Sequence, residues 1–207
     1  MKGLVSGLLV LVLFEVSLAA PEPAIVQKPG DWTLDVRYEQ PQQIVLPGAV
    51  QQRYWYIILT LTNKSGKDVD FYPQCELLTD TVRLVPAVKG ASAVLFEKIK
   101  NRHQGRYPLL QLLENVGNKM LQGQDNAVDV AVIFPDFDPN AKNVNIFIAG
   151  LSNETVVVDH PCEKDPDGKP IKVYLRKTLE LTCSIAGDPA FRSDQKLKFE
   201  SKRWVMR

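Results

Sequence analysis

The segment Asp159-His160-Pro161-Cys162 holds the side chains best suited to chemistry, because it places a carboxylate, an imidazole and a thiol next to one another. Such a set could bind a metal ion, or the histidine could lower the pKa of the thiol and so create a nucleophile. Zinc would need a third or fourth protein ligand, and no Cys-x-x-Cys or His-x-x-x-His spacing supplies one. His160 and Cys162 are therefore candidate metal ligands or catalytic groups, and an ordinary loop is the interpretation that we favour.

Asp136 and Asp138 are a second pair of side chains with a spacing that could hold a metal ion. The stretch from Asp136 to Asn140 resembles the start of a calcium-binding loop. Such a loop needs glycine at its sixth position and glutamate at its twelfth, where this chain has Ala141 and Phe147. We expect a loop that connects two strands, with weak calcium binding as the alternative.

The other short motifs do not complete a catalytic centre. Gly150-Leu151-Ser152 lacks the second glycine of a serine nucleophile turn, and Gly66-Lys67 lacks the upstream glycine of a phosphate loop. We therefore expect a non-catalytic protein and predict no cofactor. The alternative is a hydrolase or metal-dependent protein that uses the loop around His160 and Cys162.

Two triplets, Asn63-Lys64-Ser65 and Asn153-Glu154-Thr155, fit the acceptor pattern for N-linked glycosylation. Both fall in predicted turns, which is compatible with modification. In a bacterial host neither triplet would be meaningful.

The chain has three cysteines, Cys75, Cys162 and Cys183, so at least one thiol has no partner within the chain. A hairpin could bring Cys162 next to Cys183. A disulfide between these two is one interpretation, and three free thiols is the other. Three cysteines do not make a disulfide scaffold, so a hydrophobic core must stabilise the fold.

The first residues resemble an export signal. Lys2 precedes an apolar run, and Ser17-Leu18-Ala19 places small residues at the positions that a signal peptidase reads. We predict a signal peptide over residues 1–19, an extended leader over residues 20–31, and a periplasmic or extracellular location. An uncleaved membrane anchor is the alternative, and after cleavage we expect no integral membrane span.

The charge of the chain is balanced, with 25 basic and 24 acidic side chains among 207 residues. This balance provides no electrostatic reason for binding nucleic acid or an anionic membrane surface. We predict no nucleic-acid partner; a protein or an envelope component remains open.

Alternating apolar and polar residues predict a strand-rich chain. One face of residues 54–62 is wholly apolar and is typical of a core face: Trp55, Ile57, Leu59 and Leu61. Tyr54 and Tyr56 lie on the opposite face. They are candidate binding residues if water covers that face, and scaffold if predicted helices cover it. Similar alternation predicts strands within residues 32–38, 128–134, 144–148, 155–158, 171–175, 178–185 and 197–206, and one long bent strand over 171–185 is the alternative. Asp165-Pro166-Asp167-Gly168 predicts a turn.

Residues 92–103 and 108–121 follow helical spacing instead, with Ser92 as an N-cap of the first helix. They predict a helical hairpin inserted among the strands, around residues 91–122. The polar connector that follows it, with Gln124, Asp125 and Asn126, is a candidate recognition site, although a simple turn is the interpretation that we favour.

The run YWYIILTLTNKSGKDVDF resembles a pattern of bacterial extracellular immunoglobulin-like domains, in which an apolar strand ends in Thr-Asn before a Ser-Gly-Lys-Asp turn. It is also similar to uncharacterised exported bacterial proteins. The resemblance implies a mainly β fold, an immunoglobulin-like antiparallel β-sandwich, here over residues 32–207 with the helical insertion. It implies a binding or structural module of the cell envelope or extracellular space. A subunit of an envelope assembly is a further alternative.

Overall fold

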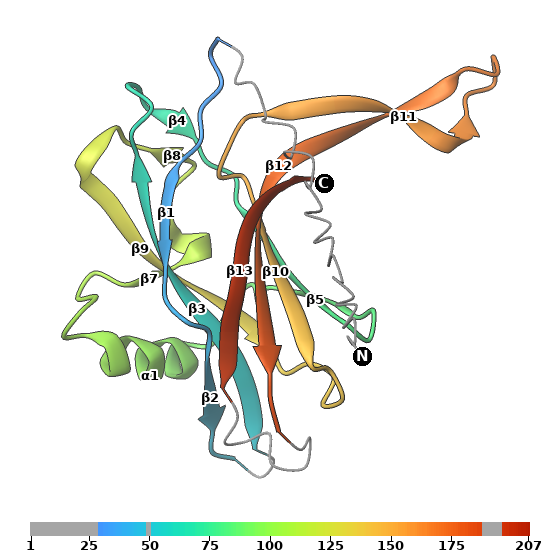
Figure 1. Ribbon diagram of the computed structural model, residues 1–207. Coiled ribbons are helices and arrows are strands. Elements are labelled where there is room, and N and C mark those ends of the chain that lie inside the picture. Colours follow the sequence, from blue (N-terminus) through green and yellow to red (C-terminus); the bar gives the residue numbers. More distant parts are fainter. Residues whose placement is uncertain (1–28, 49–50, 188–195) are drawn as a thin grey trace, which may run out of the picture.

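The computed structural model describes residues 29–48, 51–187 and 196–207 (Figure 1). The secondary structure is mainly β, and nearly all neighbouring strands run antiparallel. The predicted signal peptide, residues 1–19, and residues 20–28 of the predicted leader lie outside the described residues. Within the described part of the chain, no helix has the length and apolar character needed to cross a membrane.

Five strands form the first sheet, in the order β1-β3-β9-β7, with β2 also beside β3. The strands are β1 (Asp35–Tyr38), β2 (Gln42–Leu46), β3 (Gln52–Asn63), β7 (Gln111–Leu112) and β9 (Gly123–Pro135). The long pairing of β3 with β9 forms its centre, with Trp55 opposite Phe134 and Leu59 opposite Val130.

Six strands form the second sheet, in the order β11-β12-β10-β5-β6, with β13 also beside β12. The strands are β5 (Gln74–Thr79), β6 (Leu84–Pro86), β10 (Asn143–Ala149), β11 (Thr155–Lys164), β12 (Pro170–Ile185) and β13 (Leu197–Met206). Two short strands, β4 (Val69–Asp70) and β8 (Lys119–Met120), make a separate pair. The long β12 has three neighbours, because β11 pairs with its first half, and β10 and β13 pair with its second half.

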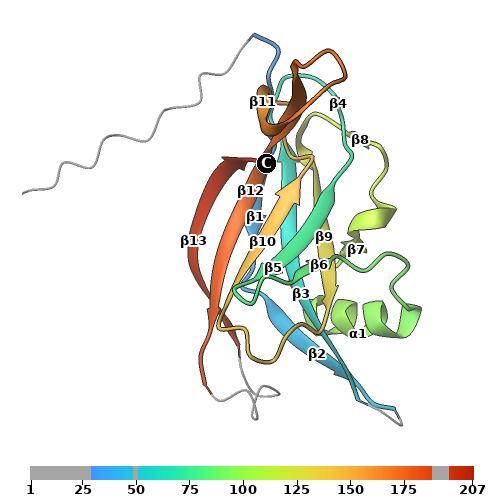
Figure 2. The same ribbon diagram turned by 90° about the vertical axis from the view of Figure 1, so that its right-hand side faces the viewer.

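The main core is the cluster of buried side chains between the two sheets (Figure 2). The alternation in β3 explains its composition, since Trp55, Ile57, Leu59 and Leu61 all point into it and are at most 1% exposed. The second sheet contributes Leu77, Val144, Ile146, Ile148, Leu179 and Leu181. The arrangement fits the expected antiparallel β-sandwich.

A second cluster, the outer core, lies on the opposite face of β3 and β9, under helix α1 (Ala93–His103). Tyr56, Ile58 and Ile133 come from the sheet, and Leu95 and Ile99 come from the helix. The predicted N-cap is confirmed, because the Ser92 hydroxyl accepts a hydrogen bond from the Leu95 amide at 3.3 Å. Tyr56 and Ile58, which alternation assigned to the second face of β3, are therefore covered by α1, and Figure 2 shows this helix beside β3 and β9.

The predicted second helix, residues 108–121, is wrong. The chain there forms β7, a short 3-10 helix (Leu113–Asn115) and β8. Its apolar residues are divided between clusters, since Leu112 packs in the outer core and Met120 packs in the main core. A single helix could not place both, and pairing of β7 with β9 satisfies the backbone instead. The helical hairpin is thus reduced to α1 alone.

Candidate functional site

His160 lies in β11, where the pairing register with β12 shifts between Asp159 and Lys164. Its Nδ1 atom accepts hydrogen bonds from the backbone amides of Cys162, at 3.3 Å, and Glu163, at 2.8 Å. The histidine therefore stabilises an irregular stretch of its own strand. In the described ranges, no three His, Cys, Asp or Glu side chains lie close enough together to hold a metal ion.

Asp136 and Asp138 each serve a separate local contact. One oxygen of Asp136 accepts a hydrogen bond from the Trp55 indole at 2.9 Å, and the other pairs with Arg53 at 3.3 Å. Asp138 accepts a hydrogen bond from the Asn140 amide at 2.9 Å, and this bond lowers the pKa of its carboxyl group. Both carboxylates thus hold the loop between β9 and β10, as a strand connection would require.

Tyr56 is 1% exposed and packs with residues of α1, so of the two alternatives for this residue the structure contains the scaffold. Its hydroxyl lies 2.8 Å from His103 Nε2 and 3.3 Å from Arg102 Nη1, both in the last turn of α1. Burial raises the pKa of Tyr56, and burial together with the charge of Arg102 lowers the pKa of His103. This polar contact attaches the end of α1 to the sheet. Tyr54 is half-buried at the edge of the outer core, with its hydroxyl bonded to Gln52.

Gln124, Asp125 and Asn126 form the exposed start of β9 rather than a turn. The Asn126 amide donates to the Gln122 carbonyl at 2.7 Å, which stabilises the entry into the strand. Gln124 borders an open cleft of about 700 Å³ on the outer face of the first sheet. Of the three predicted recognition residues, Gln124 lines this cleft and Asn126 lines a smaller hollow of about 270 Å³.

The cleft contains both signs of charge, and its acids are already paired. Glu39 accepts a hydrogen bond from the Tyr107 hydroxyl at 2.6 Å and pairs with Arg106 at 2.9 Å. Burial and the bond to Glu39 raise the pKa of Tyr107 to about 12. Asp129 accepts a bond from Thr60 at 2.6 Å. These contacts stabilise the wall of the cleft. Because the wall carries both acidic and basic side chains, its charge favours neither an anionic nor a cationic ligand.

The three cysteines are free thiols, so the disulfide interpretation for Cys162 and Cys183 is not what the structure contains. Cys183 is buried in the main core with Cys75, whereas Cys162 is exposed on β11. The hairpin does not bring Cys162 next to Cys183, because Cys183 lies opposite Val144 and Phe199 near the far end of β12. Burial raises the pKa of both core thiols to about 12, which makes them poor nucleophiles.

The asparagines of both glycosylation triplets make hydrogen bonds within the protein, with Asn63 buried and Asn153 exposed. Asn63 is 0% exposed, and its amide donates to the carbonyls of Lys67 and Met120 at 2.8 Å each. The Asn153 side chain accepts from the Trp32 amide at 2.7 Å and donates to the Gly30 carbonyl at 3.2 Å. Glycosylation replaces one of the two hydrogens of the side-chain amide, so at Asn63, which donates both, it would remove a hydrogen bond from the folded protein.

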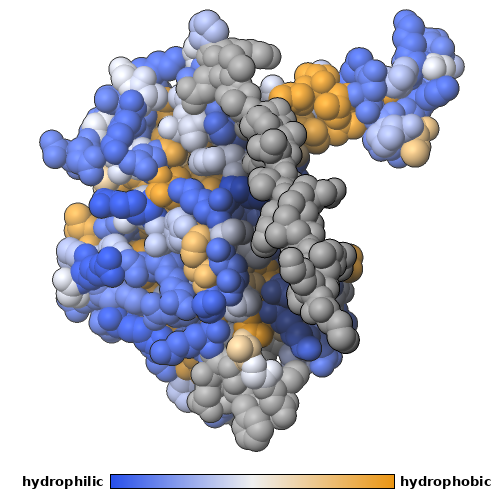
Figure 3. Space-filling model, viewed as in Figure 1, coloured by the Kyte–Doolittle hydropathy of each residue, from blue (hydrophilic) through white to orange (hydrophobic). Residues whose placement is uncertain are grey.

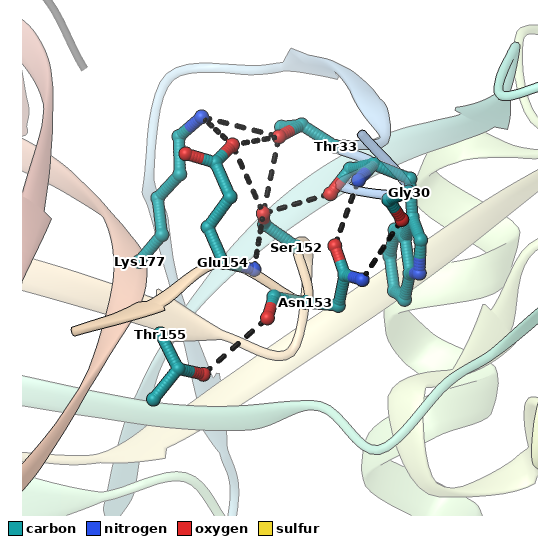
Figure 4. A network of polar contacts seen from close by, with 8 residues as sticks. Gly30, Thr33, Ser152, Asn153, Glu154, Thr155 and Lys177 are labelled. Carbon is teal, nitrogen blue, oxygen red and sulfur yellow. Dashed lines mark hydrogen bonds and ion pairs between the residues drawn. The ribbon is translucent and has the colours of Figure 1, made fainter. Parts of the chain in front are cut away.

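A buried polar network that the sequence did not reveal surrounds Glu154 and Lys177 (Figure 4). The two side chains form an ion pair with exposed fractions of 5% and 9%. Thr33 donates to Glu154 at 3.1 Å, and Ser152 donates to the Trp32 carbonyl at 2.8 Å. The network joins the first described residues to the turn after β10 and to β12. The sequence did not indicate that Lys177 is buried, because a single lysine in a strand is usually exposed.

The largest exposed feature is the arm, which we define as β11 together with residues 170–176 of β12. It projects from the rest of the molecule (Figure 1) and ends in the predicted turn, where the Gly168 amide donates to the Asp165 carbonyl at 2.9 Å. The pattern predicted strands at 155–158, 171–175 and 178–185 but not the length of the hairpin, because alternation alone does not show which strand extends beyond its sheet.

One face of the arm is apolar. Val156 is opposite Leu175 and Val158 is opposite Val173, and directly opposite residues point to the same side of an antiparallel pair. Val156 and Val158 are 43% and 38% exposed, and Figure 3 shows the hydrophobic surface at the base of the arm. The other face carries Val157, Tyr174 and the ion pair of Asp159 with Lys172.

Comparison with known proteins identifies no relative: no protein-family model, no curated protein and no solved structure matches this chain. The class that the fold itself defines is a mainly β protein built of antiparallel sheets.

Proposed function

We propose that this chain is an exported, non-catalytic immunoglobulin-like β-sandwich protein that binds another protein through the arm. The observation that carries this proposal is the exposed apolar surface of the arm. Val156 and Val158 lie on one face of the two-stranded ribbon and Val157 and Tyr174 on the other, and these side chains are 38–68% exposed. An isolated two-stranded hairpin is marginal in water, and apolar surface of this kind marks interaction sites.

The strand order supports the immunoglobulin-like assignment. The immunoglobulin sandwich has neighbours A-B-E-D in one sheet and C′-C-F-G in the other. The orders β1-β3-β9-β7 and β6-β5-β10-β12 correspond to these series in both position and sequence. The parallel pairing of β7 with β9, the extra strand β13 and the arm are departures from that plan.

The local contacts of the candidate chemical groups support a non-catalytic role. His160 holds backbone amides of its own strand, Asp136 holds Trp55 and Arg53, and Asp138 holds its loop. Each group is therefore explained by folding. Export is supported by the apolar segment and small residues of the first 19 positions, which have the form of a cleavable signal.

Photo-crosslinking in the cells that produce the protein tests the proposed binding role. A photoreactive phenylalanine analogue would replace Val157 on the arm or, as a matched control, Val94 on α1, since both are exposed valines, at 49% and 71%. We expect a covalent protein adduct of defined mass from position 157 and none from position 94. No adduct from position 157, or equal adducts from both, would contradict the proposal.

Metal analysis of the purified protein tests the non-catalytic part separately. Stoichiometric zinc, copper or calcium would contradict it and would favour the metal-dependent alternative at His160 and Cys162. We expect metal well below one equivalent per chain.

A further inference from the structure

The free edge of β11 has a definite hydrogen-bonding pattern. Lys177 donates its amide to the Glu154 carbonyl at 2.9 Å, so in this antiparallel ladder Glu154, Val156 and Val158 direct their backbone groups toward β12. The residues between them direct theirs outward. β11 is the terminal strand of its sheet in the described part of the chain, so Thr155, Val157 and Asp159 present unpaired amides and carbonyls there.

We infer that the arm binds a second copy of this chain, by antiparallel pairing of the two β11 edges about a two-fold axis at Val157. This inference rests on the proposed function of the arm and names its partner. With the axis at Val157, that residue faces its own copy, and Thr155 of each chain faces Asp159 of the other. All three residues with outward backbone groups then pair at once, and the two arms become one four-stranded sheet.

The side chains fit this register on both faces. On the apolar face, each Val156 lies opposite Val158 of the other copy, at the close spacing of a non-hydrogen-bonded pair. Within each arm, Leu175 lies beside Val156 and Val173 lies beside Val158, so the apolar row continues across all four strands. At the junction, Val156 of one copy and Val158 of the other cover each other's exposed side. On the other face, Val157 and Tyr174 of the two copies form a second apolar row.

Charge favours a second copy as the occupant. Residues 155–176 contain four acidic and four basic side chains, and the whole chain has a net charge of only +1, so two arms do not repel each other. In the proposed register, Asp159 faces the neutral Thr155 while keeping its own Lys172, and no two like charges stand opposite each other. The balanced charge of the arm would give no electrostatic attraction to a strongly acidic or strongly basic partner.

Directed disulfide formation tests the axis. In a Cys162→Ser background, which removes the exposed thiol, Val157→Cys would place two cysteines across the axis with Cα atoms about 5.5 Å apart, within reach of a disulfide. Tyr174→Cys is the matched control, because it lies opposite Val157 on the outer strand of the sheet. Its copies would be about 14 Å apart, too far to bridge. Mild oxidation should give a covalent dimer for Val157→Cys alone.

Light scattering across a concentration series tests the association itself. We expect the mass of two chains at high concentration, at least a tenfold weaker association for Val157→Lys, and less than a threefold change for Tyr174→Lys. A single-chain mass at every concentration, a dimer insensitive to Val157→Lys, or equal oxidation of both cysteine variants would overturn the inference.

The photo-crosslinking experiment separates this inference from the function on which it rests. An adduct at position 157 with twice the chain mass supports both. An adduct with a different protein, from a chain that stays monomeric, overturns the second copy as partner and leaves the binding role in place. No adduct and no dimer would overturn both.

Discussion

The buried ion pair of Glu154 and Lys177 contributes to the stability of the contact between residues 32–33, residues 152–154 and β12. Their side chains are 5% and 9% exposed, so loss of either partner leaves the other charge buried in protein. One Glu154 oxygen, Oε2, has no hydrogen-bond partner among the described residues, which makes the pair sensitive to any further loss. Lys177 also lies 5.2 Å from the centre of the Trp204 ring, so it contacts the last strand as well.

Replacement of Lys177 by methionine should lower the free energy of unfolding by about 3–5 kcal/mol, because it strands the Glu154 carboxylate. The double variant Glu154→Leu with Lys177→Met should recover much of this loss, since no charge is then buried. Urea denaturation of the two variants measures the difference. A double variant less stable than the single variant would contradict the assignment of the loss to the uncompensated charge.

The three thiols should differ sharply in reactivity. In the folded protein at pH 8, a thiol reagent should modify one cysteine, Cys162, because the core thiols of Cys75 and Cys183 have a pKa of about 12 and are buried. After unfolding, the count should rise to three. Mass spectrometry of the labelled chain gives both numbers. No reactive thiol in the folded protein and one after unfolding without reductant would instead indicate a disulfide that includes Cys162, as in the interpretation that joins it to Cys183.

His103 should make the protein less stable at mildly acidic pH. Its folded pKa lies below the ordinary 6.5, first because of burial and then because of Arg102. The unfolded chain therefore binds a proton more readily, so the free energy of unfolding falls as pH decreases through about 6.5. Denaturation of the wild type and of His103→Gln, which keeps a polar group near Tyr56, should show a smaller decrease between pH 7.5 and 5.5 for the variant. Equal slopes would contradict this role.

At the scale of the element, α1 depends on its buried face. Leu95 and Ile99 are at most 1% exposed against β3 and β9, while Val94 on the same helix is 71% exposed. Basic residues in its last turn are placed favourably for the helix dipole and also reach the sheet, since Arg102 donates to the Gln43 carbonyl at 3.0 Å. The helix is thus attached by packing along its length and by polar contacts at its end.

Ile99→Ala should lower the free energy of unfolding by about 2–4 kcal/mol, because it leaves a cavity between the helix and the sheet. Val94→Ala, a substitution on the exposed side of the same helix, should change it by less than about 0.5 kcal/mol. Chemical denaturation compares the two. Equal losses would mean that α1 does not cover the sheet as described.

At the scale of the whole molecule, the arm should be separable from the sandwich. Its outer residues contact one another and are largely exposed, so their removal takes little from either core. Replacement of residues 159–172 by Asn-Gly would join Val158 to Val173, which already face each other, through a favourable hairpin turn. We expect the free energy of unfolding to change by less than about 1 kcal/mol, measured in urea. A loss above about 3 kcal/mol would show that the arm supports the fold.

The sequence predicted most strands because alternation with period two reports directly which face of a strand is buried. It also predicted α1 through Ser92 and its helical spacing. It failed between residues 108 and 121, where apolar residues at helical spacing serve two different clusters, with Leu112 in one and Met120 in the other. Periodicity reports that residues are buried but not in which cluster they are buried.

The candidate site shows the same division. The sequence identified the residue types that could do chemistry, but hydrogen bonds between distant segments determine what each one does, as with Asp136 and the Trp55 indole. The burial of Glu154 and Lys177 likewise comes from three segments that meet only in the folded chain.

The sequence by itself therefore determined the β-rich class, the core face of β3, the start of α1 and the turn at the tip of the arm, because each depends on neighbours in the chain. Only the tertiary structure decided that Tyr56 is buried under α1, that three thiols are free, and that β11 and the first half of β12 extend beyond the sandwich with an apolar face exposed. These outcomes depend on which segments meet, and local sequence patterns carry no information about that.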